Sequence, residues 1–239
     1  MIQELWQALL LIIFPRSCAG CGTKDTILCK KCMRLFDKDI EREIAHSFMA
    51  FSCAYYEKEA RSAILSWKDH GDEELDSILG AIMARRCIRI LEPLLSRQMQ
   101  LCIVPVPSSP SSIRHRRRAH MIPIAREVAR RINTSFSEGT THCSAHVCPI
   151  LSIDKRVHKA VTASGKQNRL RRLDRRLQIK PCTHGESSYV ILMDDIVTTG
   201  ATLRSCVRML RLHGKEVIAC CALCDAHTEE YLSFDSEHL

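Results

Sequence analysis

The segment from residue 190 to residue 202 constrains the fold of this 239-residue chain more than any other. An apolar run precedes two aspartates, Asp194 and Asp195, and a turn rich in threonine leads into the amphipathic stretch Ala201–Leu212. This order is typical of a buried strand, a turn and a helix. A second apolar run follows at Glu216–Leu223, and strand–helix–strand units build parallel sheets with crossover helices. The segment therefore predicts an α/β fold with a parallel sheet.

The remaining apolar patterns add elements to this sheet. Helices are expected within residues 53–70, over 73–97 and from Pro123 to Ile132, and strands at Leu101–Val106, Cys148–Leu151 and Tyr189–Met193. Residues 33–52 have the mixed pattern of a connector. With 46% apolar and 26% charged residues, the composition is that of a globular protein. We expect two parts: residues 1–52, with an N-terminal helix, a cysteine knuckle and the connector, and residues 53–239, the α/β domain.

The turn after the strand has the composition of a phosphate site. Thr198, Thr199 and Thr202 offer hydroxyl groups, and Gly200 lets the main chain approach a ligand. The helix that begins at Ala201 directs its positive end toward an anion. The adjacent carboxylates repel a phosphate, but they accept hydrogen bonds from sugar hydroxyls or hold Mg²⁺. The pattern predicts a ribose 5-phosphate site. The alternative is a turn whose threonines only cap the helix.

Four cysteines near the N-terminus have the spacing of a zinc site. Cys18, Cys21, Cys29 and Cys32 form two Cys-x2-Cys pairs separated by seven residues. Four thiolates satisfy tetrahedral Zn²⁺ and leave no open position, so such sites are structural. The alternative is a set of free or redox-active thiols.

Two other groups of cysteine and histidine are open to a metal interpretation. Cys221-x2-Cys224-x2-His227 has chelate spacing, but it lies on an expected buried strand, which favours a role in the core. The run His142-Cys143-x2-His146-x-Cys148 is open between a metal site and an ordinary loop.

The compartment is expected to be a reducing cytoplasm. The apolar run Ala8–Phe14 has no positive segment before it and no small-residue cleavage site, so it does not resemble a secretion signal. It is also too short to span a bilayer. We expect a short helix that packs on the body, with membrane contact as the alternative. In the cytoplasm, clustered cysteines bind metal more often than they form disulfides.

Motifs along nearly the whole chain resemble those of one family. They are Phe14-Pro15 before the first Cys-x2-Cys, the second Cys-x2-Cys, the set Tyr56-Glu57, Arg61, Ile64, Lys68 and Gly71-Asp72, the run Val104-Pro105-Val106-Pro107, and the segment 190–202. The last closely resembles the phosphoribosyl-pyrophosphate signature of type I phosphoribosyltransferases, and the whole set resembles the ComF family. The resemblance implies a type I phosphoribosyltransferase-like fold, often linked to competence for DNA uptake.

The resemblance also implies roles for residues. Asp194 and Asp195 would bind the ribose hydroxyls of phosphoribosyl pyrophosphate, and Thr198, Thr199, Gly200, Ala201 and Thr202 its 5′-phosphate. A pyrophosphate loop would include Ser108, Ser109, Arg114 and Arg118, and a flexible loop would include Gln167, Arg171 and Arg175. The alternatives are a solvated basic loop and an exposed cationic helix. Lys68 is open between a phosphate contact and a surface position.

Two departures from the family pattern bear on activity. Arg118-Ala119-His120-Met121-Ile122 stands where Arg-Gly-Phe-Asn-Gln is usual, and Gln178 aligns with a usual asparagine. We expect binding of phosphoribosyl pyrophosphate with Mg²⁺, and transfer of phosphoribosyl to a base or an amine if catalysis is retained. The alternative is a non-catalytic competence-type protein that assists single-stranded DNA uptake or recombination, with single-stranded DNA or the competence machinery as partner. The net charge of +8 suits either anion, but no aromatic residue for base stacking lies within the basic run 155–180.

Overall fold

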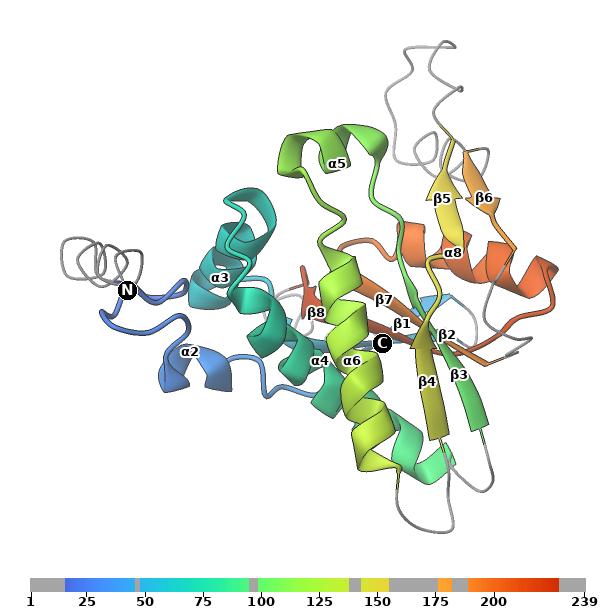
Figure 1. The fold of residues 1–239 in the computed structure, drawn as a ribbon, viewed down its shortest axis with the longest axis horizontal. Coiled ribbons are helices and arrows are strands. Elements are labelled where there is room, and N and C mark those ends of the chain that lie inside the picture. Colours follow the sequence, from blue (N-terminus) through green and yellow to red (C-terminus); the bar gives the residue numbers. More distant parts are fainter. Residues whose placement is uncertain are drawn as a thin grey trace, which may run out of the picture.

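A six-stranded, mostly parallel sheet forms the centre of the molecule. The computed structural model describes residues 16–45, 48–94, 99–137, 143–154, 176–181 and 189–227. The strands of the sheet are Ile40–Ala45 (β1), Phe48–Tyr55 (β2), Met99–Pro105 (β3), Cys143–Val147 (β4), Tyr189–Val197 (β7) and Glu216–Asp225 (β8). Their spatial order is β1-β2-β8-β7-β3-β4 (Figure 1). Only β1 and β2 are antiparallel neighbours.

Helices cover both faces of the sheet. They are Lys30–Arg34 (α2), Lys58–Asp69 (α3), Leu75–Leu91 (α4, followed by a 3₁₀ turn at Glu92–Leu94), Pro110–Arg116 (α5), Met121–Ser135 (α6) and Ala201–Leu212 (α8). Figure 1 shows α3, α4 and α6 gathered on one side of the sheet and α8 on the other. Two short antiparallel strands, Leu151–Ile153 (β5) and Leu177–Ile179 (β6), pack on the α8 side. This arrangement confirms the α/β fold expected from the sequence.

Strand β7 shows how the two cores are built. Ile191 and Met193 face the core under α4 and α6, whereas Val190 and Leu192 face the core under α8. All four are fully buried. Side chains alternate along a strand, and a central parallel strand is covered on both faces, so an uninterrupted apolar run fits this position.

Several elements differ from their expected bounds. Helix α8 begins and ends where the sequence predicts, but β7 continues past its apolar run to Val197. The expected connector over residues 33–52 is wrong, because it contains α2's last residues, β1 and most of β2, and β2 pairs with β8. Strand β2 also crosses residue 52, where the sequence analysis divides the chain.

The strand expected at residues 148–151 is also wrong. The chain instead leaves β4 at Val147 and re-enters a strand at Leu151. Pro149 lies between them, and proline has no N–H to donate to a strand ladder. The expected N-terminal helix lies outside the described residues. Within the described residues, no helix is long and apolar enough to cross a membrane.

Candidate functional site

The turn between β7 and α8 depends on a glycine. Gly200 is buried and has a φ of +69°, a conformation that side chains with a Cβ rarely adopt. A Cβ at this position would lie 2.8 Å from Cγ2 of Ile44. Glycine is therefore required twice, once for the backbone conformation and once for the close approach of β1.

The threonines of this turn do not cap the helix. Gly200 is the N-cap residue of α8, and no side chain makes a capping hydrogen bond there. Thr198 and Thr199 are exposed. Their carbonyl oxygens accept hydrogen bonds, from the guanidinium group of Arg42 at 2.7 Å and from that of Arg204 at 2.9 Å respectively. No threonine side chain is seen to cap α8 among the described contacts, so the hydroxyl groups and the first N–H groups of α8 are available to an anion.

The two aspartates follow the apolar run on β7 and differ in their surroundings. Asp195 is 7% exposed, and its Oδ2 accepts a hydrogen bond from Nε2 of His120 at 2.7 Å. The same oxygen forms an ion pair with Lys68, at the end of α3. Asp194 is half-buried and accepts the backbone N–H of Asp195 at 2.9 Å. Because side chains alternate along a strand, Asp195 faces α3 and α6, whereas Asp194 faces the α8 side.

This environment separates the pKa values of the two acids. Burial and, to a smaller extent, the negative charge of Asp195 together raise the pKa of Asp194 to about 8. Burial alone would also raise the pKa of Asp195, but the hydrogen bond from His120 and the charge of Lys68 lower it to about 2. At neutral pH the pair therefore carries its negative charge on Asp195.

A second layer holds His120 in place. Its ring meets the ring of Trp67 edge to face, with centroids 4.9 Å apart. Nε1 of Trp67 donates to Asp76 at 2.7 Å, and Arg118 donates two hydrogen bonds, at 2.7 and 2.8 Å, to the same carboxylate. Arg118, which the sequence assigns to the pyrophosphate loop, is thus paired with an acid of α4.

The expected pyrophosphate loop contains a short helix, α5. Oγ of Ser109 caps it by accepting the N–H of Ser112 at 3.1 Å. Ser108 and Arg114 instead line a cavity of about 610 Å³ between this segment and the β5–β6 pair. Figure 1 shows α5 and the β5–β6 pair projecting beyond the same end of the sheet. The lining of this cavity includes none of the aspartates or threonines of the turn.

The expected flexible loop, with Gln167, Arg171 and Arg175, lies outside the described residues. The strands that flank it pair as a hairpin, with Ile153 opposite Leu177.

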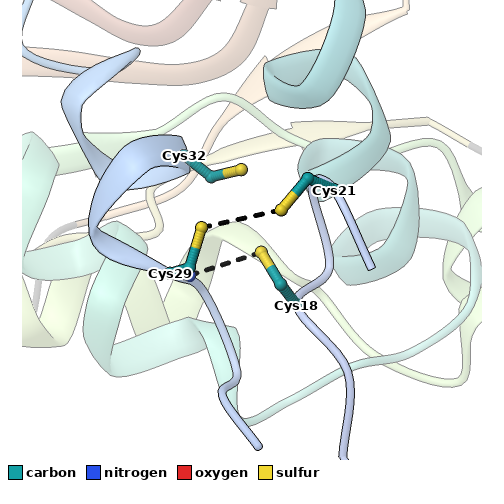
Figure 2. A group of neighbouring side chains, drawn as sticks. All are labelled: Cys18, Cys21, Cys29 and Cys32. Atoms are coloured by element: carbon teal, nitrogen blue, oxygen red, sulfur yellow. Dashed lines mark hydrogen bonds between the residues drawn. The ribbon is translucent and has the colours of Figure 1, made fainter. Parts of the chain in front are cut away.

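The four N-terminal cysteines converge, as Figure 2 shows. Their sulfur atoms all lie within 4.8 Å of one another, with Cys21 and Cys29 at 3.6 Å. The N–H of Cys29 donates to the sulfur of Cys18 at 3.3 Å.

Local hydrogen bonds prepare two of these thiols as ligands. Hydrogen bonds from Thr23 lower the pKa of Cys21 to about 6. Burial opposes ionisation of Cys18, yet backbone hydrogen bonds lower its pKa, whereas burial raises that of Cys32. Four sulfurs in this arrangement fit a tetrahedral metal ion and can hold a structural Zn²⁺.

The other chelate-like motif near the C-terminus belongs to the core. Cys221 and Cys224 are fully buried, and burial raises the pKa of Cys224. Within the described residues they form no convergent group with His227. The core interpretation is therefore confirmed.

Comparison with known proteins bears on the second half of the chain. Residues 122–235 match the phosphoribosyl transferase domain. This match begins inside α6 and includes the whole β7–α8 turn. Together with the mostly parallel sheet, it indicates the α/β fold of type I phosphoribosyltransferases for this part of the chain. Comparison with curated proteins gives no match.

Solved phosphoribosyltransferases are distant neighbours. A hypoxanthine phosphoribosyltransferase from Staphylococcus aureus is 15% identical, with a TM-score of 0.33, over 63% of this chain and 64% of that one. An orotate phosphoribosyltransferase from Aeropyrum pernix is 16% identical, with a TM-score of 0.33, over 77% of this chain and 75% of that one. The chain thus spans less than two thirds of the length of the first of these structures.

Sequence reasoning missed part of the site. The pairing of Asp195 with Lys68 and His120 joins α3, the start of α6 and β7. The only sequence signal for His120 was its place in a departure from the family pattern.

Proposed function

We propose that the chain binds phosphoribosyl pyrophosphate at the carboxyl end of β7 and transfers the phosphoribosyl group to a base or an amine. The observation that carries this proposal is the turn from Thr198 to Thr202, where uncapped N–H groups and hydroxyls stand beside a buried, charged carboxylate. A phosphate and a sugar are recognised there by different groups within one short segment.

The 5′-phosphate is assigned to the turn. Gly200 brings the backbone of α8's first residues close to the ligand, and Thr198, Thr199 and Thr202 supply hydroxyl donors. The helix N-terminus adds a favourable electrostatic field for the dianion. The domain match over residues 122–235 supports this assignment.

The ribose hydroxyls are assigned to Asp194 and Asp195. Asp195 is held ready as a charged acceptor by His120 and Lys68. When a sugar hydroxyl donates to this carboxylate, Lys68 becomes free to turn its ammonium group toward the pyrophosphate. Lys68 would then stabilise negative charge on the leaving group.

The oxygen donors of the site fit Mg²⁺. Asp194 is half-buried, and one of its oxygens accepts the Asp195 N–H. The other oxygen would bind a hard cation that displaces the proton Asp194 holds at neutral pH. Asp194 and the oxygens of the ligand would hold the ion. When bound, Mg²⁺ supplies charge stabilisation to the departing pyrophosphate.

The transfer joins the acceptor nitrogen to C1′ of the ribose as the bond from C1′ to the pyrophosphate oxygen breaks, the pyrophosphate leaves, and the acceptor nitrogen gives up its proton to water. In this site Asp195 orients the sugar and the turn anchors its phosphate, so that C1′ is held in a fixed orientation toward the acceptor. Arg114 and Ser108, in the 610 Å³ cavity, are candidates for contacts with pyrophosphate once the segment from Pro105 to Arg118 closes on the ligand.

Pyrophosphate release tests the proposal. The protein is incubated with Mg²⁺, phosphoribosyl pyrophosphate and each member of a panel of purines, pyrimidines and amines. We expect one class of acceptor to stimulate release, and Asp195→Asn to abolish that stimulation. Asp37→Asn, a surface acid paired with Arg85, is the matched control and should leave it unchanged. If no acceptor stimulates release, the proposed transfer is wrong. Binding of phosphoribosyl pyrophosphate is then measured separately.

Membership of the ComF family and binding of single-stranded DNA stay predictions of the sequence. A fluorescence titration with labelled single-stranded DNA at low and high salt addresses the second. Electrostatic binding should weaken steeply as salt rises.

A further inference from the structure

A second group of thiols and an imidazole gathers at the β3–β4 edge of the sheet. Cys102 of β3 is the direct parallel partner of His146 of β4. The chain beyond β4 continues this ladder for one residue, because the N–H of Cys148 donates to the carbonyl of Ile103 at 2.8 Å. Residues 44 positions apart in sequence are thus brought together by strand pairing.

The three side chains converge on one point. The sulfur atoms of Cys102 and Cys148 are 3.0 Å apart, and Nε2 of His146 is 3.5 Å from the sulfur of Cys102. All three ligand atoms lie within 4.8 Å of one another. Cys102 and Cys148 are buried and His146 is half-buried, so the group faces the apolar core under α8 with one side near the surface.

These distances suit a zinc ion. With metal–sulfur bonds of about 2.3 Å and metal–nitrogen bonds of about 2.0 Å, tetrahedral coordination separates sulfur from nitrogen by about 3.5 Å and two sulfurs by about 3.8 Å. The first separation is already present, and the second needs only a small outward rotation of one thiol. A buried cysteine alone is usually a small apolar residue, but apolar packing gives no reason for an imidazole to meet two thiols.

We propose that Cys102, His146 and Cys148 form a second Zn²⁺ site, separate from the N-terminal knuckle and independent of the function proposed above. Binding deprotonates the two thiols and releases two protons, and the imidazole binds as the neutral ring. Three protein ligands leave a fourth coordination position for water or another donor.

The site would anchor the hairpin that lines the cavity. Cys148 is followed by Pro149 and Ile150, and the carbonyl of Ile150 accepts the N–H of Lys180, next to β6. A metal at Cys148 therefore ties the β5–β6 pair to the sheet. Its loss should loosen this pair, whose residues Ser152 and Gln178 line the cavity.

Metal content of the full chain tests the proposal. Protein purified under reducing conditions should hold about two zinc ions per chain, one at each thiolate site. His146→Ala and Cys148→Ser should each hold about one fewer. Cys143→Ala is the matched control, because Cys143 lies on the same strand but faces the opposite core, and it should hold as much as the unmodified chain.

A measurement on the unmodified chain covers the case in which a variant does not fold. X-ray absorption at the zinc edge should show about two nitrogen or oxygen ligands for every six sulfurs, because the knuckle supplies four sulfurs and the new site supplies two sulfurs, one imidazole nitrogen and one water. Pure sulfur coordination with one zinc per chain would overturn the proposal. So would a Cys102–Cys148 disulfide found by peptide mapping in chains that hold a single zinc ion.

Discussion

Replacing Gly200 with alanine tests the packing of the turn between β7 and α8. The alanine must keep the φ of +69° that Gly200 has, and this conformation costs about 1–2 kcal/mol for a residue with a side chain. The alanine Cβ also lies 2.8 and 3.0 Å from two carbon atoms of Ile44, and such overpacking typically costs about 1–3 kcal/mol. The sum is a loss of about 2–5 kcal/mol. For a chain of this length, this lowers the melting temperature by on the order of 10 °C.

Gly214→Ala separates the two contributions. Gly214 has nearly the same φ, +71°, but a Cβ there meets no atom within 4 Å. Urea denaturation should therefore show a loss of about 1–2 kcal/mol for this control, from backbone strain alone. The double variant Gly200→Ala with Ile44→Ala should lose less stability than the two single variants lose in sum. The difference should equal the overpacking contribution, about 1–3 kcal/mol. Equal losses for the two single glycine variants would refute the argument.

Three further predictions concern charge and metal. The pKa of Asp194 is raised from 3.8 to about 8 in the folded chain, so its contribution to stability is fully present below about pH 4 and is lost as the pH rises through 8. Asp194→Asn should remove this pH dependence from the urea midpoints measured at pH 5 and pH 8. Lys68→Met leaves Asp195 with His120 alone and should cost up to about 3 kcal/mol in urea denaturation. Cys21→Ser should remove about one zinc ion per chain and lower the melting temperature.

Each of these has a contrary result. The urea midpoint should drop more from pH 5 to pH 8 in the unmodified chain than in Asp194→Asn. Equal drops in the two proteins would contradict the raised pKa of Asp194. Unchanged stability of Lys68→Met means that the ion pair contributes nothing. Full zinc content in Cys21→Ser removes that thiol from the knuckle.

The sequence predicts most fully what lies within one short segment. The β7–α8 unit follows from its order of apolar, acidic and threonine residues, because the strand, the turn and the start of the helix depend on residues that are adjacent in the chain. Even there β7 is longer than expected. Asp194 and Asp195 interrupt the apolar run, yet β7 still pairs with β8 as far as Val197.

Contacts between distant segments were not predictable in this way. Asp195 meets Lys68 and His120 only because α3 and α6 pack against β7. Cys102 meets Cys148 because β3 and β4 are neighbours, and Arg118 turns to Asp76 because α4 lies beside the start of α6. None of these pairs has a spacing that marks it in the sequence.

A calorimetric titration of the chain with phosphoribosyl pyrophosphate in the presence of Mg²⁺ tests ligand binding at the β7–α8 turn most directly. We expect binding of about one ligand per chain. Thr199→Val, which removes one hydroxyl, and Asp195→Asn, which removes the charged acceptor, should each weaken it at least about tenfold. Ribose 5-phosphate should compete for the same site. An affinity that both variants leave unchanged would mean that the ligand does not bind at the β7–α8 turn.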